Sequence, residues 1–186
     1  MKRLFIAINF SDNQDINLHF LKLKNLLKNN KIAWIKPENM HLTIKYIGSM
    51  PSEKIENMIN LMEESLDKRK SFLLEFDKIG IFGSSYNPRV IWIGFKECHI
   101  LNEIAENIKS NFVKLGISYD RQNFVPHITI GRINKIESKQ YFQKVISDNR
   151  QINCSPVLVN KIILYESILQ KNGPEYQILK TIELTK

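Results

Sequence analysis

Two histidines in this chain have a spacing that could support acid–base chemistry. The sequence contains four His and four Thr, and Thr43 follows His41 by two positions just as Thr129 follows His127. In a β-strand, side chains at i and i+2 point to one face, about 6.6 Å apart, while those at i+1 and i+3 point to the other. Each motif would therefore present an imidazole and a hydroxyl together, with aliphatic residues packed behind them.

Such a set of groups suits in-line displacement at a phosphodiester. That reaction needs a base to take a proton from the attacking oxygen and an acid to protonate the departing oxygen on the far side of phosphorus. Histidine can play either part near neutral pH, so His41 and His127 are the predicted catalytic pair. Thr43 and Thr129 could bind the non-bridging oxygens, and Arg132 could hold the phosphate bidentately.

The segments that carry these motifs are repeated along the chain. Residues 3–8, a helix and residues 41–44 are echoed by residues 89–94, a helix and residues 127–130. The two strand starts and the two histidines are both 86 residues apart. Two copies of one strand–helix–strand unit, packed about a pseudo-two-fold axis, would bring the motifs face to face across a cleft.

Alternating strands and helices with short turns favour an α+β fold with antiparallel sheets over a doubly wound parallel sheet. We expect a single domain over residues 1–186, built as two pseudo-symmetric, intertwined lobes around a central cleft, with helices on the outside. Ser11 and Gln14 have the capping-box spacing for the first helix. Helices are predicted to begin after residues 11 and 51 and to cover 101–115 and 138–146. Strands are predicted at 4–10, 32–35, 41–47, 72–81, 90–95, 125–133, 157–164 and 176–184.

The composition indicates a basic globular protein. The formal charge of +8 and the pI near 9.4 are compatible with a polyanionic partner and equally with a basic protein that binds no nucleic acid. The two cysteines form no disulfide framework or Cys-x-x-Cys pair, which fits a reduced, cytoplasmic location. The apolar N-terminal run is too short for a signal peptide, and no segment approaches the length of a membrane helix. We expect a soluble monomer.

The paired motifs resemble those of the two-histidine (2H) phosphoesterase superfamily, whose mark is a pair of His-x-Thr/Ser-x sequences ending in a hydrophobic residue. The resemblance covers essentially the whole chain and is closest to the RNA 2′,3′-cyclic phosphodiesterase, or 2′-5′ RNA ligase-like, branch. The matching segments are RLFIAI (3–8), WIKPEN (34–39), KYIG (45–48), PRVIWIG (88–94), PHITIGR (126–132) and LYES (164–167).

The resemblance implies two similar α+β lobes, catalysis by His41 and His127 without a metal or cofactor, and phosphate binding by Thr43 and Thr129. It also implies that O3′ departs, leaving a 2′-phosphate. The expected substrate is RNA with 2′,3′-cyclic phosphate ends, including tRNA fragments. The family often places an Arg immediately before Pro-His, where this chain has Val125, so a contact made by that Arg is absent or moved.

Other functions and sites stay open at this point. The same chemistry could act on 2′-5′-linked oligonucleotides or other small cyclic phosphodiesters, and a non-catalytic RNA-binding module would keep the fold without needing both motifs. A metallophosphoesterase would need clustered Asp and His, which the sequence lacks. Further candidates are Arg89 for substrate contact, Phe82, Tyr86, Phe124 and Tyr165 for base stacking, and Cys98, His99 and Cys154 for a zinc site without a standard ligand spacing.

The pair of histidines cannot choose the leaving oxygen by its own chemistry, because either imidazole could be acid or base. The choice must come from how unequal lobes seat the sugar. Arg132 is present on one side, whereas the equivalent position in the first copy is Tyr46. We assign His41 as the acid that protonates O3′ and His127 as the base that activates water, with the reverse assignment left open.

Overall fold

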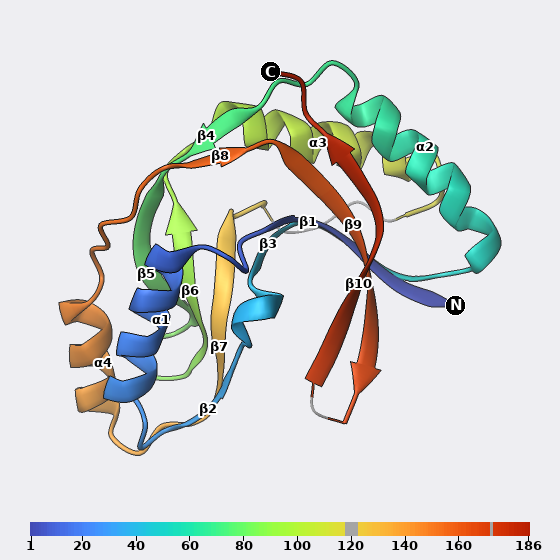
Figure 1. The fold of residues 1–186 in the computed structure, drawn as a ribbon. Coiled ribbons are helices and arrows are strands. Elements are labelled where there is room, and N and C mark those ends of the chain that lie inside the picture. The colour runs from blue at the N-terminus through green and yellow to red at the C-terminus, as the bar shows by residue number, and fades with distance from the viewer. Residues whose placement is uncertain (118–122, 172) are drawn as a thin grey trace.

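The computed structural model describes residues 1–117, 123–171 and 173–186. Its main element is an antiparallel sheet with the strand order β10-β9-β1-β3-β7-β6-β5, in which β2 also pairs with β7. One half of the sheet contains β1 (Lys2–Asn9), β3 (His41–Met50), β9 (Lys161–Gln170) and β10 (Gly173–Glu183). The other half contains β2 (Lys31–Trp34), β5 (Phe76–Gly83), β6 (Pro88–Phe95) and β7 (His127–Lys135). The predicted α+β fold with antiparallel sheets is confirmed (Figure 1).

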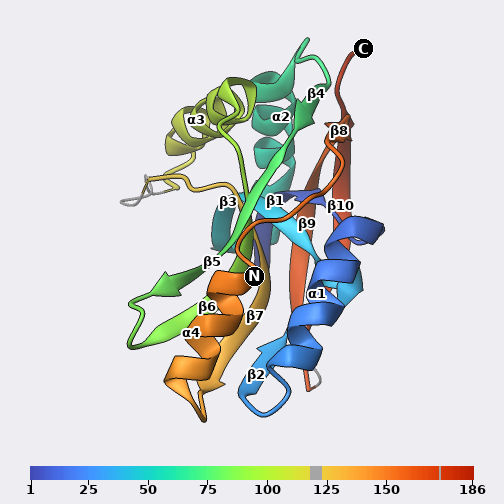
Figure 2. The same cartoon turned by 90° about the vertical axis from the view of Figure 1, so that its left-hand side faces the viewer.

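The two halves exchange helices. Helix α1 (Gln14–Leu26) follows β1 but lies with α4 (Lys139–Asp148) against the half that holds β7, and the Tyr141 hydroxyl of α4 donates to the Leu26 carbonyl of α1. Helix α3 (His99–Val113) follows β6 but packs with α2 (Ile55–Leu66) over the half that holds β3 (Figure 2). The halves are therefore intertwined rather than successive along the chain.

The hydrophobic core runs beneath both halves without interruption. Leu42 and Ile44 of β3, and Ile128 and Ile130 of β7, are buried on the helix-facing side of the sheet. They belong to one cluster with residues of all four α-helices, namely Phe20 and Leu23, Met58 and Met62, Ile104 and Ile108, and Phe142. The alternation of each motif thus places its aliphatic residues in this core and turns His and Thr to the opposite face.

The two halves meet where β3 and β7 lie side by side. The register pairs Leu42 with Ile128, two residues that are 86 positions apart and equivalent in the repeat. An antiparallel pair of equivalent residues is the arrangement that a two-fold axis between the strands requires. The predicted lobes are therefore joined into one continuous sheet at this point.

The register of the outer strands corrects the predicted repeat by one residue. Thr43 lies opposite Ala7, whereas Thr129 lies opposite Trp92, so β1 and β6 are related by 85 residues rather than 86. Arg3 and Arg89 are therefore not structural equivalents. The spacing of 86 holds for the motif strands β3 and β7.

Two predicted strands are each divided in two. Residues 72–81 form β4 (Phe72–Leu74) and β5, and residues 157–164 form β8 (Val157–Val159) and the start of β9. The short segments β4 and β8 leave the main sheet and pair with each other in a separate two-stranded sheet. The breaks fall at Glu75 and Asn160, two residue types that are depleted in strands, but local propensity does not reveal the change of partner.

The first helix begins later than the capping-box spacing predicts. Asn13, not Ser11, is the N-cap, and its side-chain oxygen accepts from the Ile16 amide at 2.9 Å. The Ser11 amide instead donates to the Asn9 side chain at 2.8 Å in the turn that precedes the helix. Asn13 therefore satisfies one of the free amides at the helix N-terminus.

We expect Asn13→Ala to lower the free energy of unfolding by about 1 kcal/mol, because the Ile16 amide loses its acceptor. Ser11→Ala is the matched control and should change stability by only a few tenths, since the Ser11 contact uses its main chain. Urea denaturation at constant m-value measures both. An equal or larger loss for Ser11→Ala would show that the helix is capped from residue 11.

Candidate active site

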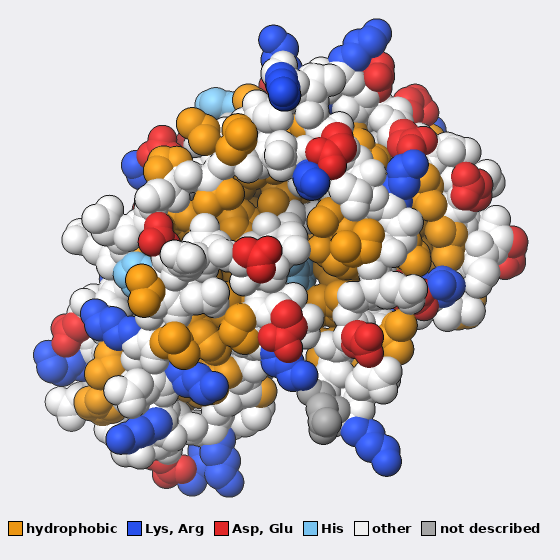
Figure 3. All heavy atoms as spheres, in the orientation of Figure 1, with side chains coloured by type: hydrophobic (Ala, Val, Ile, Leu, Met, Phe, Trp, Pro, Cys, Tyr) orange, Lys and Arg blue, Asp and Glu red, His pale blue; other side chains and the backbone are white. Residues whose placement is uncertain are grey.

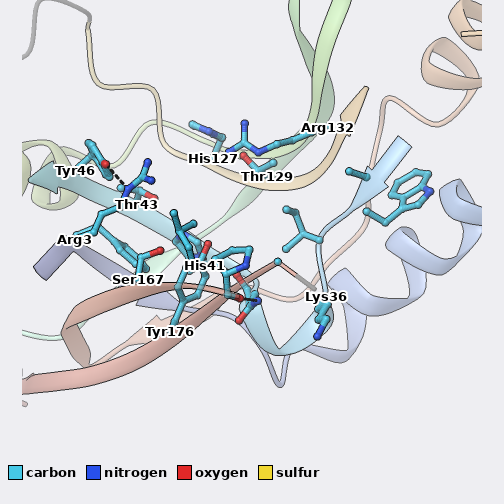
Figure 4. A pocket seen from close by; sticks show the side chains of 18 residues that line it. Arg3, Lys36, His41, Thr43, Tyr46, His127, Thr129, Arg132, Ser167 and Tyr176 are labelled. Carbon is cyan, nitrogen blue, oxygen red and sulfur yellow. Dashed lines mark hydrogen bonds between the residues drawn. The ribbon is translucent and has the colours of Figure 1, made fainter. Parts of the chain in front are cut away.

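A cleft of about 520 Å³ between the two halves brings together all five predicted site residues. His41 and Thr43 line it from β3, and His127, Thr129 and Arg132 line it from β7. Figure 4 shows His41 and His127 on opposite sides of this cleft, with Arg132 close to Thr129. The described lining includes the cations Arg3 and Lys36 but no Asp or Glu, so the charge of the cleft favours an anion.

A bulge explains why Arg132 shares a face with Thr129 despite the odd spacing between them. In the β6–β7 ladder, Gly131 pairs with Ile91 and Thr129 with Trp92, so Ile130 is an extra residue. An extra residue reverses the alternation of the side chains that follow it. The side chain of Arg132 therefore points to the cleft, where a regular strand would turn it to the core.

The same bulge occurs in the first copy. Lys45 pairs with Ile6 and Thr43 with Ala7, which leaves Ile44 as the extra residue of β3. Tyr46 is thereby directed to the cleft, at the position that Arg132 occupies in the second copy. The predicted exchange of Arg for Tyr between the lobes is thus placed in the cleft itself.

Main-chain carbonyls orient both imidazoles in the same way. His41 Nδ1 lies 2.7 Å from the Asn39 carbonyl oxygen, and His127 Nδ1 lies 2.7 Å from that of Val125. A carbonyl oxygen only accepts, so Nδ1 carries the proton in both rings and Nε2 is left to exchange a proton in the cleft. Val125, which stands where the family often has Arg, contributes through its main chain.

The two imidazoles have different neighbours. The His41 ring packs against Phe5 and Tyr176, with ring centroids 4.9 and 5.2 Å apart, in a small aromatic cluster that also includes Tyr165. The His127 ring packs edge-on with Phe82, with the centroids 4.7 Å apart and an interplanar angle of 87°. The pseudo-symmetry of the motifs therefore does not extend to the side chains around them.

Burial lowers the pKa of both histidines below the ordinary value of 6.5. The positive charge of Arg132 lowers both pKa values further, whereas the hydrogen bonds to the Asn39 and Val125 carbonyls raise them. The charge of His127 is an additional cause of the lowered pKa of His41. An anion in the cleft would offset these effects and stabilise an imidazolium.

Sequence analysis assigned no role to several residues that line the cleft. Arg3, Tyr46, Ser167 and Tyr176 face it from β1, β3, β9 and β10. Three of them lie in segments that carry the family resemblance, but their common location depends on a strand order that no local pattern shows. The repeat had already marked Tyr46 as the equivalent of Arg132, but it gave Tyr46 no role in the cleft.

The other sequence candidates have different locations. Arg89 and Tyr86 line a separate groove with Ile133, and Phe124 lines a pocket adjoining His127. Tyr165 is buried against Phe5, with ring centroids 5.1 Å apart, whereas Phe82 contacts His127. Base stacking by these aromatic residues stays a prediction.

No three or more His, Cys, Asp or Glu side chains gather into a possible metal cluster within the described ranges, and Cys98, His99 and Cys154 do not form one. Burial and the nearby Asp15 carboxylate raise the pKa of Cys154 to about 11. None of the described helices is long and apolar enough to span a membrane.

The intertwined α+β fold and the paired His-x-Thr motifs facing one cleft define a two-histidine phosphoesterase. The chain belongs to the LigT-like phosphoesterase family, which matches residues 11–92 and 96–176. Each matched segment contains one of the motifs.

Relatives of similar length support this membership. The RNA 2′,3′-cyclic phosphodiesterase of Methanocaldococcus jannaschii is 33% identical over 178 residues, covering 96% of this chain and 98% of that protein. The RNA 2′,3′-cyclic phosphodiesterase of Thermotoga maritima is 30% identical over 179 residues, covering 95% and 92%.

Solved structures share the fold. The crystal structure of E. coli LigT complexed with 3′-AMP matches with a TM-score of 0.80 and 22% identity, covering 100% of this chain and 99% of that one. The crystal structure of TT0787 of Thermus thermophilus matches with a TM-score of 0.78 and 21% identity, covering 98% and 97%.

We expect NMR titration to give midpoints below 6.5 for both His41 and His127, because burial and Arg132 disfavour the imidazolium. Arg132→Gln removes a positive charge, so both midpoints should rise. Arg89→Gln removes an equal charge outside the cleft and should leave both midpoints in place. Midpoints that do not respond to Arg132→Gln would show that its charge does not reach the imidazoles.

Proposed function

We propose that this protein hydrolyses 2′,3′-cyclic phosphate ends of RNA to 2′-phosphates by two-histidine acid–base catalysis without a metal. The observation that carries the proposal is the pair of imidazoles on opposite sides of one cleft. Each keeps Nε2 available because a carbonyl holds Nδ1, and each lies beside a Thr on the same strand face. The two relatives named above as RNA 2′,3′-cyclic phosphodiesterases support the choice of substrate.

The reaction needs one neutral and one protonated imidazole. The neutral ring takes a proton from water as the water oxygen forms a bond to phosphorus. The P–O3′ bond breaks, and the protonated ring gives its proton to O3′, which leaves a 2′-phosphate and a free 3′-hydroxyl. The step conserves protons, because the base gains one proton from water and the acid gives one proton to O3′.

Side chains of the cleft can also stabilise the negative charge that develops on the non-bridging oxygens. The hydroxyls of Thr43 and Thr129 can donate hydrogen bonds to them, and the Arg132 guanidinium can add a bidentate, charge-assisted contact. None of the described carboxylates forms an ion pair with Arg132. Since acid, base and charge stabilisation all come from side chains, no step requires a metal ion.

The charge distribution favours RNA over an uncharged substrate. The net charge is +8, and Figure 3 shows Lys and Arg side chains spread over one face and interspersed with Asp and Glu rather than gathered in one patch. The cleft differs from this mixed surface because its described lining has Arg3, Lys36 and Arg132 without a carboxylate. We therefore expect the cations of the cleft, rather than the outer surface, to select an anionic substrate.

We expect His41→Ala and His127→Ala each to reduce turnover of 2′,3′-cyclic AMP by roughly 10²–10⁴-fold, the usual effect of losing an acid or a base. His19→Ala on α1 is the matched control and should retain activity. Circular dichroism of each variant checks folding. A chelator should leave the wild-type rate unchanged. Near-full activity in either cleft variant, or activity that requires added divalent ions, would contradict the mechanism.

The assignment of His41 as acid and His127 as base stays a prediction. In this assignment the bound substrate must raise the pKa of His41, because burial and the charge of His127 lower it. The anionic phosphate can supply this stabilisation if it approaches His41 closely.

A substrate with sulfur in place of O3′ separates the two roles. A thiolate departs without needing a proton, so His41→Ala should recover most of its lost rate on this substrate, whereas His127→Ala should not. Chromatography of the products from 2′,3′-cyclic AMP should show 2′-AMP. Recovery by His127→Ala instead would reverse the assignment, and a predominantly 3′-phosphate product would show that the sugar is seated the other way round.

A further inference from the structure

Three hydrogen-bond donors meet at one end of the cleft, beside Thr43. Arg3, Tyr46 and Ser167 lie on the neighbouring strands β1, β3 and β9, and Figure 4 shows them together, at the opposite end from Lys36. The β1–β9 ladder pairs Leu4 with Glu166, so Arg3 and Ser167 occupy the next positions on their strands. The reaction described above uses none of the three.

The contact between Arg3 and Tyr46 leaves their remaining donors available. Arg3 Nε donates to the Tyr46 hydroxyl at 2.6 Å, and the guanidinium carbon lies 5.5 Å from the centre of the Tyr46 ring. The two terminal nitrogens of the guanidinium are not needed for this bond, and the phenolic hydrogen can still be donated. The pair therefore holds further N–H and O–H donors in a fixed arrangement at this end of the cleft.

The charge of Arg3 is not neutralised within the described part of the chain. The nearest acid along the ladder, Glu166, alternates to the other face of the sheet from Ser167 and pairs there with Lys2 at 2.6 Å. No ion pair of Arg3 is found among the described residues. A guanidinium with two hydroxyls beside it is a set of groups that recognises phosphate.

This group of donors lies apart from the phosphate that would react. The charge of Arg132 lowers the pKa of His41, His127 and Tyr176, and the charge of Arg3 lowers the pKa of Tyr176 further. Figure 4 shows Arg3, Tyr46 and Ser167 on one side of His41 and His127, and Arg132 on the other. A phosphate bound by Arg132 between the two imidazoles therefore does not occupy the group of donors around Arg3.

We propose that Arg3, Tyr46 and Ser167 form a second phosphate subsite, which binds the phosphodiester that joins the terminal nucleotide to the rest of the RNA. This inference rests on the proposed function, because the reacting cyclic phosphate must lie between the two histidines. The subsite makes the enzyme prefer an RNA end to a free cyclic mononucleotide. Arg3 provides the charge, and Tyr46 positions it.

The test compares substrates with and without the second phosphate. The dinucleotide ApA that ends in a 2′,3′-cyclic phosphate contains an internal phosphodiester as its second phosphate, whereas 2′,3′-cyclic AMP contains only the cyclic phosphate. We expect Arg3→Gln to lower kcat/KM for the dinucleotide about 10-fold more than that for cyclic AMP, because a charge-assisted contact is lost only with the former. Tyr46→Phe, which keeps the ring, should produce a smaller loss with the same selectivity. Arg89→Gln is the matched control, and it should alter neither value.

Substrate chemistry provides a second arm. A methylphosphonate linkage removes the charge of the internal phosphodiester. The kcat/KM of the wild-type protein should therefore be about 10-fold lower on the methylphosphonate dinucleotide than on the natural one. The kcat/KM of Arg3→Gln should be the same on both dinucleotides. Equal losses for Arg3→Gln on cyclic AMP and on the dinucleotide would place Arg3 at the reacting phosphate and overturn the subsite. No loss on either substrate would also overturn it.

Binding separates failure of the subsite from failure of the proposed function. If the wild-type protein opens neither cyclic phosphate, the proposed function fails, but calorimetry with ApAp and 3′-AMP still tests the subsite. Arg3→Gln should weaken binding of ApAp about 10-fold more than that of 3′-AMP. Equal affinities of wild type and variant for ApAp would overturn the inference. Thermal melting of each variant checks that the fold is retained.

Discussion

The pairing of Leu42 with Ile128 is the constraint on which the site depends. It joins the halves of the sheet at equivalent residues, and it turns the flanking histidines to one face while their aliphatic neighbours enter the core. The bulge that follows each Thr then returns one more side chain to that face, Tyr46 in one copy and Arg132 in the other. A shift of one residue at the junction would invert one strand relative to the other, so that only one imidazole would still face the cleft.

The parts of this arrangement that follow from local periodicity could be predicted from the sequence. His41 with Thr43, and His127 with Thr129, share a face because side chains alternate along any strand, and the repeat indicated that the two faces would meet. The α+β class followed from alternating elements with short turns. The fold and the two His-x-Thr pairs were therefore accessible without coordinates, although the catalytic roles stay predictions. Arg132 was chosen for its charge, and its place on the cleft face depends on the bulge at Ile130.

The remainder depends on relationships between distant segments. Arg3 and Ser167 come together because β1 lies between β3 and β9, an order that neither strand encodes locally. Residues 72–81 were predicted as one strand, but their first part pairs with β8 in a second sheet, a partner that local propensity does not give. The choice of Asn13 over Ser11 as N-cap reflects the Asn9 side chain, which holds the Ser11 amide in a turn.

The exchange of α1 and α3 has a consequence for how the molecule holds together. Each strand–helix–strand unit supplies its helix to the other half of the sheet, as the subunits of a domain-swapped dimer do, whereas α2 and α4 cover the half that holds the strand before them. Dividing the chain between the copies would remove one of the two covering helices from each half and leave the apolar face of that helix without its partner. The cleft between the halves therefore depends on packing that both copies contribute.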